Sequence, residues 1–129
     1  MNIIAIDLGT THCKAVIINT SGKVLKTFQL GTKPIQPKPG WNEQNPDEIF
    51  NAVLKLLQQS FSFCKEKDIA CVSFSAAMHS LLAVDKSGKL LMNMITWADL
   101  RSAKYARELK SKPVADKIYE TIQYSTSYV

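Results

Sequence analysis

The opening stretch MNIIAIDLGTTHCKAVIIN constrains the fold more than any other part of the sequence. Two apolar runs rich in β-branched residues, NIIAI and KAVIIN, flank the polar stretch DLGTTH, which predicts two strands joined by a hairpin turn. A third apolar run follows a turn at Ser21 and Gly22. Residues 2–30 are therefore predicted to form a three-stranded antiparallel meander whose first turn contains Gly9.

A helix is predicted over residues 46–63. The preceding stretch GTKPIQPKPGW is rich in proline and glycine and is typical of a surface loop. Asn45 can then cap the helix, Pro46 suits its first position, and Glu48 stands three residues after the cap. Apolar residues recur at helical spacing, so the helix is expected to pack on the sheet; they are Ile49, Val53, Leu56, Leu57 and Phe61.

The second half of the chain predicts more strands and two helices. IACVSFSA is typical of a buried strand, and SLLAVD and LLMNMITW predict two further strands around a turn at KSG. DLRSAKYARELK predicts a helix with Asp99 near its start, and a short helix is expected from Pro113 onward. Meander, helix, strands and helix together indicate an α/β chain with a mixed sheet.

Composition excludes several classes of function. The chain has 129 residues with 46% hydrophobic content, which fits one domain with one core. Its net charge of +5 comes from scattered lysines, so no nucleic-acid surface is expected. The three cysteines, Cys13, Cys64 and Cys71, lack C-x-x-C spacing and fit small buried side chains in a reducing compartment. Without a membrane span of roughly 18 apolar residues or a signal peptide, a cytoplasmic protein is expected.

The first turn combines residues that could hold a phosphate. Asp7 ends a predicted strand, and Gly9 lacks a side chain that would block close approach. The amides and hydroxyls of Thr10 and Thr11 could bind phosphate oxygens, Asp7 could orient a hydrated Mg²⁺, and Lys14 could add charge. The alternative is an ordinary hairpin with an Asx turn. Neither a Walker A loop nor a Rossmann fingerprint is present.

Two later stretches suit a hydroxylated substrate. In SFSAAMHSLLAVD, small residues present Met78 and His79, and the imidazole could hydrogen-bond a hydroxyl or a carboxylate. In ITWADLRS, Trp97, Asp99 and Arg101 combine an aromatic wall, an acceptor and a cation. The alternatives are a structural histidine, a core tryptophan, an aspartate that caps a helix and an arginine on a solvated helix face.

Four motifs in order give the chain a resemblance to the FGGY carbohydrate kinases. DLGTT, GWNEQNPDEI, SAAMHSLLAVD and TWADLRS follow one another over roughly residues 1–118. Within the family, SAAMHS followed by TWAD-R is most similar to the gluconate kinases (gluconokinases). Xylulose kinases usually carry a Q-M-H-G form and glycerol kinases an N-Q-R-E form.

The resemblance implies a ribonuclease H-like domain of the actin and hexokinase superfamily. It implies that five residues face the phosphates of ATP and Mg²⁺, with Asp7 on the metal: Asp7, Gly9, Thr10, Thr11 and Lys14. It implies that five others border the sugar-acid pocket: Met78, His79, Trp97, Asp99 and Arg101. His12 departs from the small hydroxyl residue common in the family and takes no role. GWNEQNP, where Asn42 replaces a hydrophobic residue, is interpreted as structural.

The resemblance also places essential parts outside this sequence. Family members are several times longer, and their aspartate general base and second ribonuclease H-like domain come later than residue 129. We therefore expect a partial N-terminal domain over residues 1–118 and a divergent tail over residues 119–129, consistent with a truncated or frameshifted reading frame. No catalytic base is expected within the chain.

The sequence thus predicts the N-terminal part of an ATP-dependent kinase that acts on a sugar or sugar acid, gluconate first. On its own the chain is expected to be inactive. Kinases of xylulose or another polyol, a non-catalytic remnant that binds a partner, and a ribonuclease H-like nuclease stay open as alternatives, as does a homodimer. We further predict that Met78, His79, Asp99 and Arg101 lie on one side of the sheet, near the end of the strand that delivers Asp7.

Overall fold

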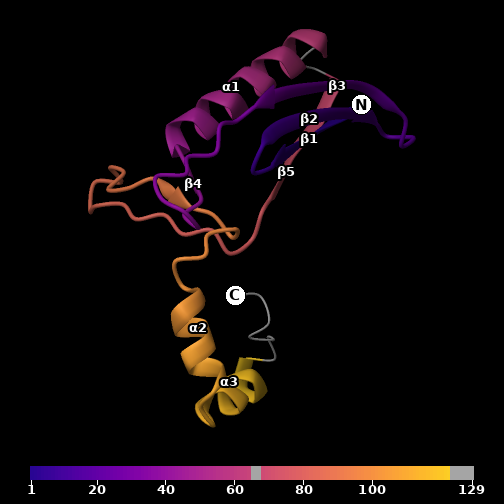
Figure 1. Ribbon diagram of the computed structural model, residues 1–129. Helices are drawn as coiled ribbons and strands as arrows, with labels where there is room; N and C mark the ends of the chain where they lie inside the picture. The colour runs from indigo at the N-terminus through magenta and orange to yellow at the C-terminus, as the bar shows by residue number, and fades with distance from the viewer. Residues whose placement is uncertain (65–67, 123–129) are drawn as a thin grey trace.

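A four-stranded sheet forms the main body of the protein in a computed structural model that describes residues 1–64 and 68–122 (Figure 1). β1 and β2 pair antiparallel, β2 and β3 pair antiparallel, and β5 lies parallel to β1 on its other side. The strand order is β3-β2-β1-β5. The predicted meander is therefore confirmed; the strands are β1 (Asn2–Leu8), β2 (His12–Asn19), β3 (Val24–Gly31) and β5 (Ile69–Ala76).

Helix α1 (Pro46–Phe63) is confirmed at both predicted ends. The side chain of Asn45 accepts a hydrogen bond from the amide of Asp47 at 2.9 Å, as an N-cap residue should. Figure 1 shows α1 lying across one face of the sheet, and its main contacts are with β1, β2 and β3.

The core lies between α1 and the first two strands. Alternate residues of paired strands share one face, as the register of Ile4 with Ile17 and of Ile6 with Ala15 shows. These residues meet the apolar stripe of α1 and are removed from solvent. The buried set is Ile4, Ile6, Cys13, Ala15, Ile17, Ala52, Val53, Leu56 and Cys64.

The prediction that IACVSFSA is a buried strand is right in type and wrong in burial. β5 forms, but most of its residues are exposed, and the side chain of Phe74 is 57% exposed. The physical reason is that β5 is an edge strand and α1 packs mainly on the other three strands, so only Ile69 and Val72 of β5 pack against the core.

The two strands predicted after β5 are wrong in extent. Only β6 (Met94–Ile95) forms, paired with β4 (Glu43–Gln44) in a small second sheet. Elsewhere the apolar stretches 80–85 and 90–97 form isolated bridges, Leu81 with Ile95 and Val84 with Leu90. These segments lie outside the main sheet and have no long neighbouring strand to extend a ladder, so apolar character alone does not make them strands.

Helices α2 (Ala103–Lys110) and α3 (Val114–Ile122) project away from the sheet (Figure 1). The predicted start of the first helix at Asp99 is wrong: Asp99 is buried, its amide closes a turn by donating to the Thr96 carbonyl at 3.1 Å, and α2 begins only at Ala103. The second helix begins one residue after Pro113, as expected. No helix within residues 1–64 and 68–122 is long and apolar enough to cross a membrane.

Candidate functional site

The turn between β1 and β2 is closed by the amide of Gly9, which donates to the carbonyl of His12 at 3.1 Å. A Cβ atom on Gly9 would lie 2.6 Å from that carbonyl oxygen, too close for any side chain. The backbone therefore requires glycine at this position, for closure of the turn itself.

Both threonine carbonyls of the turn are held by neighbouring segments. The carbonyl of Thr10 accepts from the side-chain amide of Gln44 at 2.8 Å, and the carbonyl of Thr11 accepts from the amide of Thr32 at 2.9 Å. The Thr32 hydroxyl also donates to the Thr10 carbonyl at 3.4 Å. Gln44 and Thr32 are buried, so the turn rests on a buried polar support.

Asp7 and Lys14 stand beside this turn. They are partners in the β1–β2 register, and both are exposed. Asp7 Oδ2 lies 3.9 Å from the position of a Cβ on Gly9, so the carboxylate reaches the turn. The sequence analysis gave His12 no role. In the structure its Nδ1 atom lies 3.1 Å from the hydroxyl oxygen of Thr11. The turn thus offers one carboxylate, one ammonium group and two hydroxyls within a short stretch of chain.

A cavity of about 230 Å³ joins the turn to the end of β5. Because β1 and β5 are parallel and Leu8 is paired with Ala76, both strands end at the same edge of the sheet. The cavity wall includes Gly9 and Thr10 from the turn, Ala77 and Ser80 from the segment after β5, and Gln44 from β4. Two of the motifs singled out in the sequence therefore meet around one space.

Met78 and His79 follow β5 directly within this segment. Met78 is 71% exposed, and His79 has a φ angle of 66°, a left-handed conformation that is uncommon outside glycine. Trp97 follows β6 and is 59% exposed. A β-bridge between Leu81 and Ile95 holds the segment after β5 beside β6. Leu81 is two residues after His79, and Ile95 is two residues before Trp97, so these two side chains belong to neighbouring segments.

Asp99 and Arg101 form a cluster with Glu43. Arg101 Nε donates to Asp99 Oδ1 at 2.7 Å, and its terminal nitrogen donates to Asp99 Oδ2 at 2.8 Å and to Glu43 Oε1 at 2.7 Å. Asp99 Oδ2 also accepts from the Asn42 amide at 2.6 Å. The structure therefore brings the predicted Asp99 and Arg101 together, with their polar atoms committed to each other and to residues 42–43.

The electrostatics of the cluster follow from these bonds. The hydrogen bond from Arg101 is the main cause that lowers the pKa of Asp99 to about 2. Hydrogen bonds from Arg101 and Asn93 likewise hold the pKa of Glu43 below its usual value, and the two carboxylates raise the pKa of Arg101. The guanidinium also lies over the ring of Trp41, 3.8 Å from its centroid. All three groups are thus charged at neutral pH and fix the loop between β6 and α2 to residues 41–43.

Sequence reasoning missed Glu43, Gln44 and Trp41, which it treated as one structural segment. The interpretation as structural fits Trp41 and Glu43, but their partners could not be named. Arg101 and Glu43 are 58 residues apart, and no spacing rule links them. The sequence offered one signal for these residues, namely that Glu43 and Gln44 are polar residues next to a proline-rich loop.

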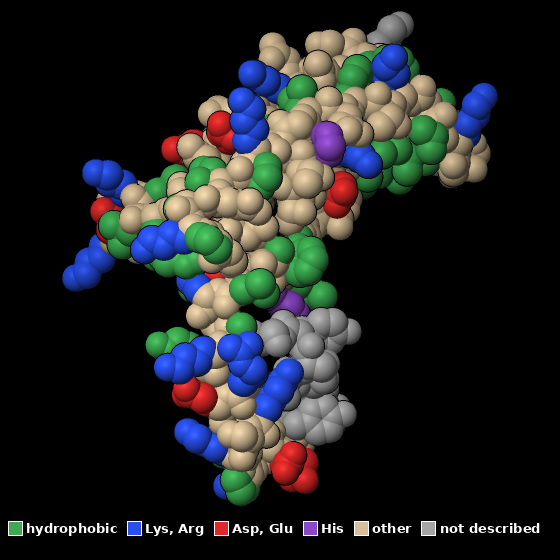
Figure 2. Space-filling view, in the orientation of Figure 1, with side chains coloured by type: hydrophobic (Ala, Val, Ile, Leu, Met, Phe, Trp, Pro, Cys, Tyr) green, Lys and Arg blue, Asp and Glu red, His purple; other side chains and the backbone are tan. Residues whose placement is uncertain are grey.

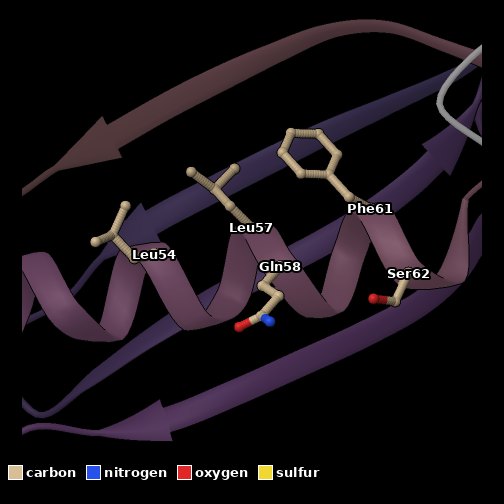
Figure 3. Close-up of a pocket in the computed structure, with 5 residues that line it drawn as sticks. All are labelled: Leu54, Leu57, Gln58, Phe61 and Ser62. Carbon is tan, nitrogen blue, oxygen red and sulfur yellow. The ribbon is translucent and has the colours of Figure 1, made fainter.

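A second hollow, of about 470 Å³, runs along α1 (Figure 3). Leu54, Leu57 and Phe61 point toward β5, while Gln58 and Ser62 point the other way. The residues that line this hollow are apolar or uncharged.

Outside the turn and the ion-pair cluster, the described residues show neither a single basic patch in the view of Figure 2 nor a group of metal ligands. Lysine and arginine side chains are spread over the face seen in Figure 2 without forming one basic patch. Within the described part of the chain, no three histidine, cysteine, aspartate or glutamate residues gather where they could hold a metal ion. Mg²⁺ commonly takes most of its ligands from water and phosphate, so a single carboxylate at the turn, such as that of Asp7, would suffice as its protein ligand.

The family comparison agrees with this geometry. The N-terminal domain of the FGGY family of carbohydrate kinases matches residues 2–128. The chain belongs to this family. The gluconokinase of Bacillus subtilis (strain 168) is 38% identical over 118 residues, which cover 92% of this chain and 23% of the relative. The chain thus spans about a quarter of the length of the FGGY relatives that it matches.

Two solved structures of kinases that are named for different substrates match the fold of this chain equally well. The gluconate kinase of Lactobacillus acidophilus gives a TM-score of 0.86 at 35% identity, covering 92% of this chain and 24% of that one. The ligand-bound xylulose kinase of the same organism gives the same values. The α/β fold predicted from the sequence is therefore confirmed, and the similarity leaves the substrate within the family undecided.

Proposed function

We propose that residues 1–118 form the phosphate-binding N-terminal part of an ATP-dependent kinase that phosphorylates a sugar or sugar acid, with gluconate as the first candidate. The carrying observation is the turn after β1. Gly9 leaves no room for a side chain, and the carbonyls of the two threonines are hydrogen-bonded to Gln44 and Thr32. The carboxylate of Asp7 and the ammonium group of Lys14 flank the turn. Membership of the FGGY family supports the same assignment.

In this proposal the phosphates of ATP lie against the outer side of the turn. Because the Gly9 amide is engaged with His12, the donors proposed for phosphate oxygens are the amides of Thr10 and Thr11 and the Thr10 hydroxyl. The Thr11 hydroxyl can join them by turning away from His12 Nδ1, from which it lies 3.1 Å. Lys14 adds a positive charge, and Asp7 holds the hydrated metal. Mg²⁺, when bound, would neutralise charge that develops on the transferred phosphoryl group.

The substrate is proposed to lie beyond the cavity, against Met78, His79 and Trp97. A thioether, an imidazole and an indole suit the apolar faces and hydroxyl groups of a sugar acid. The left-handed backbone at His79 supports a functional placement, since such conformations concentrate at ligand sites. Asp99 and Arg101 are proposed to act indirectly, by fixing the loop that carries Trp97 to residues 42–43.

In this proposal the general base and the domain that closes over ATP belong to the region of the longer FGGY kinases that this chain does not match. A general base contributes about 10²–10⁴-fold in rate, and domain closure excludes water. We therefore expect the 129-residue chain alone neither to phosphorylate gluconate nor to bind ATP tightly. The partial-domain boundary at residue 118, a cytoplasmic location and a homodimer remain predictions.

The rival functions have weaker support. A two-metal nuclease needs several converging carboxylates, and at the turn only Asp7 is available among the residues that the structure describes. A binding remnant without catalysis would retain the fold and the turn, and only an activity assay separates it from the proposal.

The test is a chimaera in which residues 1–118 replace the matching part of the Bacillus subtilis gluconokinase. A coupled assay of ADP release should show gluconate-dependent turnover within the usual kinase range of about 1–100 s⁻¹. Asp7→Ala should reduce it at least about 10²-fold by removing the metal's protein ligand. Asp116→Ala, at an exposed position on α3, is the matched control and should leave the rate unchanged.

Three outcomes would contradict parts of the proposal. A folded chimaera without turnover on any sugar would favour the remnant. Turnover of xylulose or glycerol in preference to gluconate would overturn the substrate. Turnover by the 129-residue chain at kinase rates would overturn the account of what the chain lacks.

A further inference from the structure

The short strand β4 lies between the two halves of the proposed site. Successive side chains of a strand point to opposite sides, so Glu43 and Gln44 face different partners. Glu43 accepts from Arg101 and so reaches the loop that carries Trp97, while Gln44 reaches the turn after β1. The backbone of Asn42 adds to the first connection, because its carbonyl accepts from the Thr96 amide at 3.0 Å.

Gln44 is well suited to fix a single conformation of the turn. Its side chain is almost fully buried, with the residue 2% exposed. Nε2 donates to the Thr10 carbonyl at 2.8 Å and lies 3.3 Å from the Thr32 hydroxyl. Rotation of the Thr10 carbonyl away from Gln44 would break the shorter of these two hydrogen bonds and leave the Gln44 amide with only its longer contact to Thr32, so the arrangement with both partners in place is favoured.

The planarity of the peptide bond carries this constraint to the other side of the turn. In a trans peptide the carbonyl of one residue and the amide of the next point in opposite directions. Holding the Thr10 carbonyl against Gln44 therefore directs the Thr11 amide away from Gln44. This amide is one of the donors that the proposed function assigns to phosphate.

We propose that Gln44 is a positioning residue of the phosphate turn: its side-chain amide fixes the Thr10–Thr11 peptide so that the Thr11 amide is presented to a phosphate oxygen. The inference rests on the proposed function. It adds that the support of the turn comes from β4, the same strand that anchors the Trp97 loop.

The experiment uses the full 129-residue chain, labelled with ¹⁵N, and compares the wild type with Gln44→Met and Gln44→Glu. Methionine retains the length of the side chain without a donor, and an ionised glutamate would place an acceptor against the Thr10 carbonyl. Gln59→Met, at an exposed position on α1, is the matched control.

The first measurement needs no ligand. The Thr32 amide donates to the Thr11 carbonyl, so its hydrogen exchange reports on the turn. Both Gln44 variants should speed this exchange about tenfold relative to the amide of Ile17 in the core, the size expected for one buried hydrogen bond. Gln59→Met should not. An unchanged ratio in both Gln44 variants would overturn the inference.

The second measurement follows amide shifts during titration with MgATP. In the wild type the Thr11 amide should shift at millimolar nucleotide, and in the Gln44 variants this shift should be lost while the chain stays folded. A wild type without any response at Thr10 or Thr11 would refute the phosphate role itself, whatever the exchange result. A normal Thr11 response in the variants would refute Gln44 as its positioning residue.

A wild-type measurement covers the case in which neither variant folds. The side-chain amide protons of Gln44 should exchange more slowly than those of Gln59, because only the former are buried in a hydrogen bond. Equal exchange of the two side chains would overturn the inference.

Discussion

Replacing Arg101 with methionine should remove the cation that compensates two nearly buried carboxylates. The side chain of Asp99 is 2% exposed and that of Glu43 is 11% exposed, and Arg101 makes an ion pair of 2.7 Å with each. Breaking a buried pair by removing one partner leaves the other charge without compensation and typically costs about 3–5 kcal/mol. We expect Arg101→Met to lower the free energy of unfolding by about 3 kcal/mol at pH 7.

The pH dependence of the loss identifies its cause. The hydrogen bond from Arg101 is the main cause that lowers the pKa of Asp99 from 3.8 to about 2 in the folded chain, so the ion pair makes stability depend on pH. Since the folded pKa is the lower one, this stabilisation is fully present above about pH 5 and disappears as the pH falls through 2. In Arg101→Met the buried carboxylate instead favours protonation, so the difference between wild type and variant should shrink on acidification.

Urea unfolding followed by circular dichroism at pH 7, 5 and 3 measures both effects. Arg107→Met, at an exposed position on α2, is the control and should change the free energy of unfolding by less than about 0.5 kcal/mol. A loss below about 1 kcal/mol for Arg101→Met at pH 7, or an equal loss at pH 7 and pH 3, would refute the reasoning.

Two substitutions and one labelling experiment test the turn, the helix and the core. Gly9→Ala should lower the free energy of unfolding in urea by about 1–3 kcal/mol, because the new Cβ would lie 2.6 Å from the His12 carbonyl oxygen. Gly31→Ala is the control and should cost less than half as much, because the nearest atom to its Cβ lies 4.0 Å away. Equal losses of stability would contradict the steric argument. Asn45→Ala should lower stability by about 1 kcal/mol through loss of the cap of α1, and exposed Asn51→Ala should not; matching values would show that the cap contributes nothing. A thiol reagent should label Cys71 rapidly, while Cys13 and Cys64 react only after unfolding, and burial also raises the pKa of the Cys13 thiol; rapid labelling of all three would mean that the core is open.

Local signals in the sequence were sufficient for the first half of the fold. The meander and α1 were predictable because alternation, turn residues and a complete cap at Asn45 act over a few positions each. The strands expected over residues 80–85 and 90–97 failed because a ladder depends on a neighbour, which no local pattern specifies. The burial expected of β5 failed for a related reason, since it depends on which strands α1 covers.

The candidate site was predictable in its parts and not in its connections. Asp7, Gly9 and the two threonines stood out because a short turn held several functional groups. Asp99 was expected to begin a helix or to meet substrate, but its partners are Arg101 and the Asn42 amide. Gln44 gave no signal, because an amide side chain becomes informative only when the group it supports is known.

The exposed edge of β5 bears on how this chain behaves in concentrated solution. Its sequence IACVSFSA contains no charged residue and no proline, the two devices by which proteins usually prevent edge-to-edge pairing between molecules. Beyond β1, the described residues supply no second strand to cover it. We therefore expect high protein concentration to promote intermolecular β-pairing through this strand, and we expect a lysine at an exposed position of β5 to oppose such pairing without altering the turn, the cap or the ion-pair cluster.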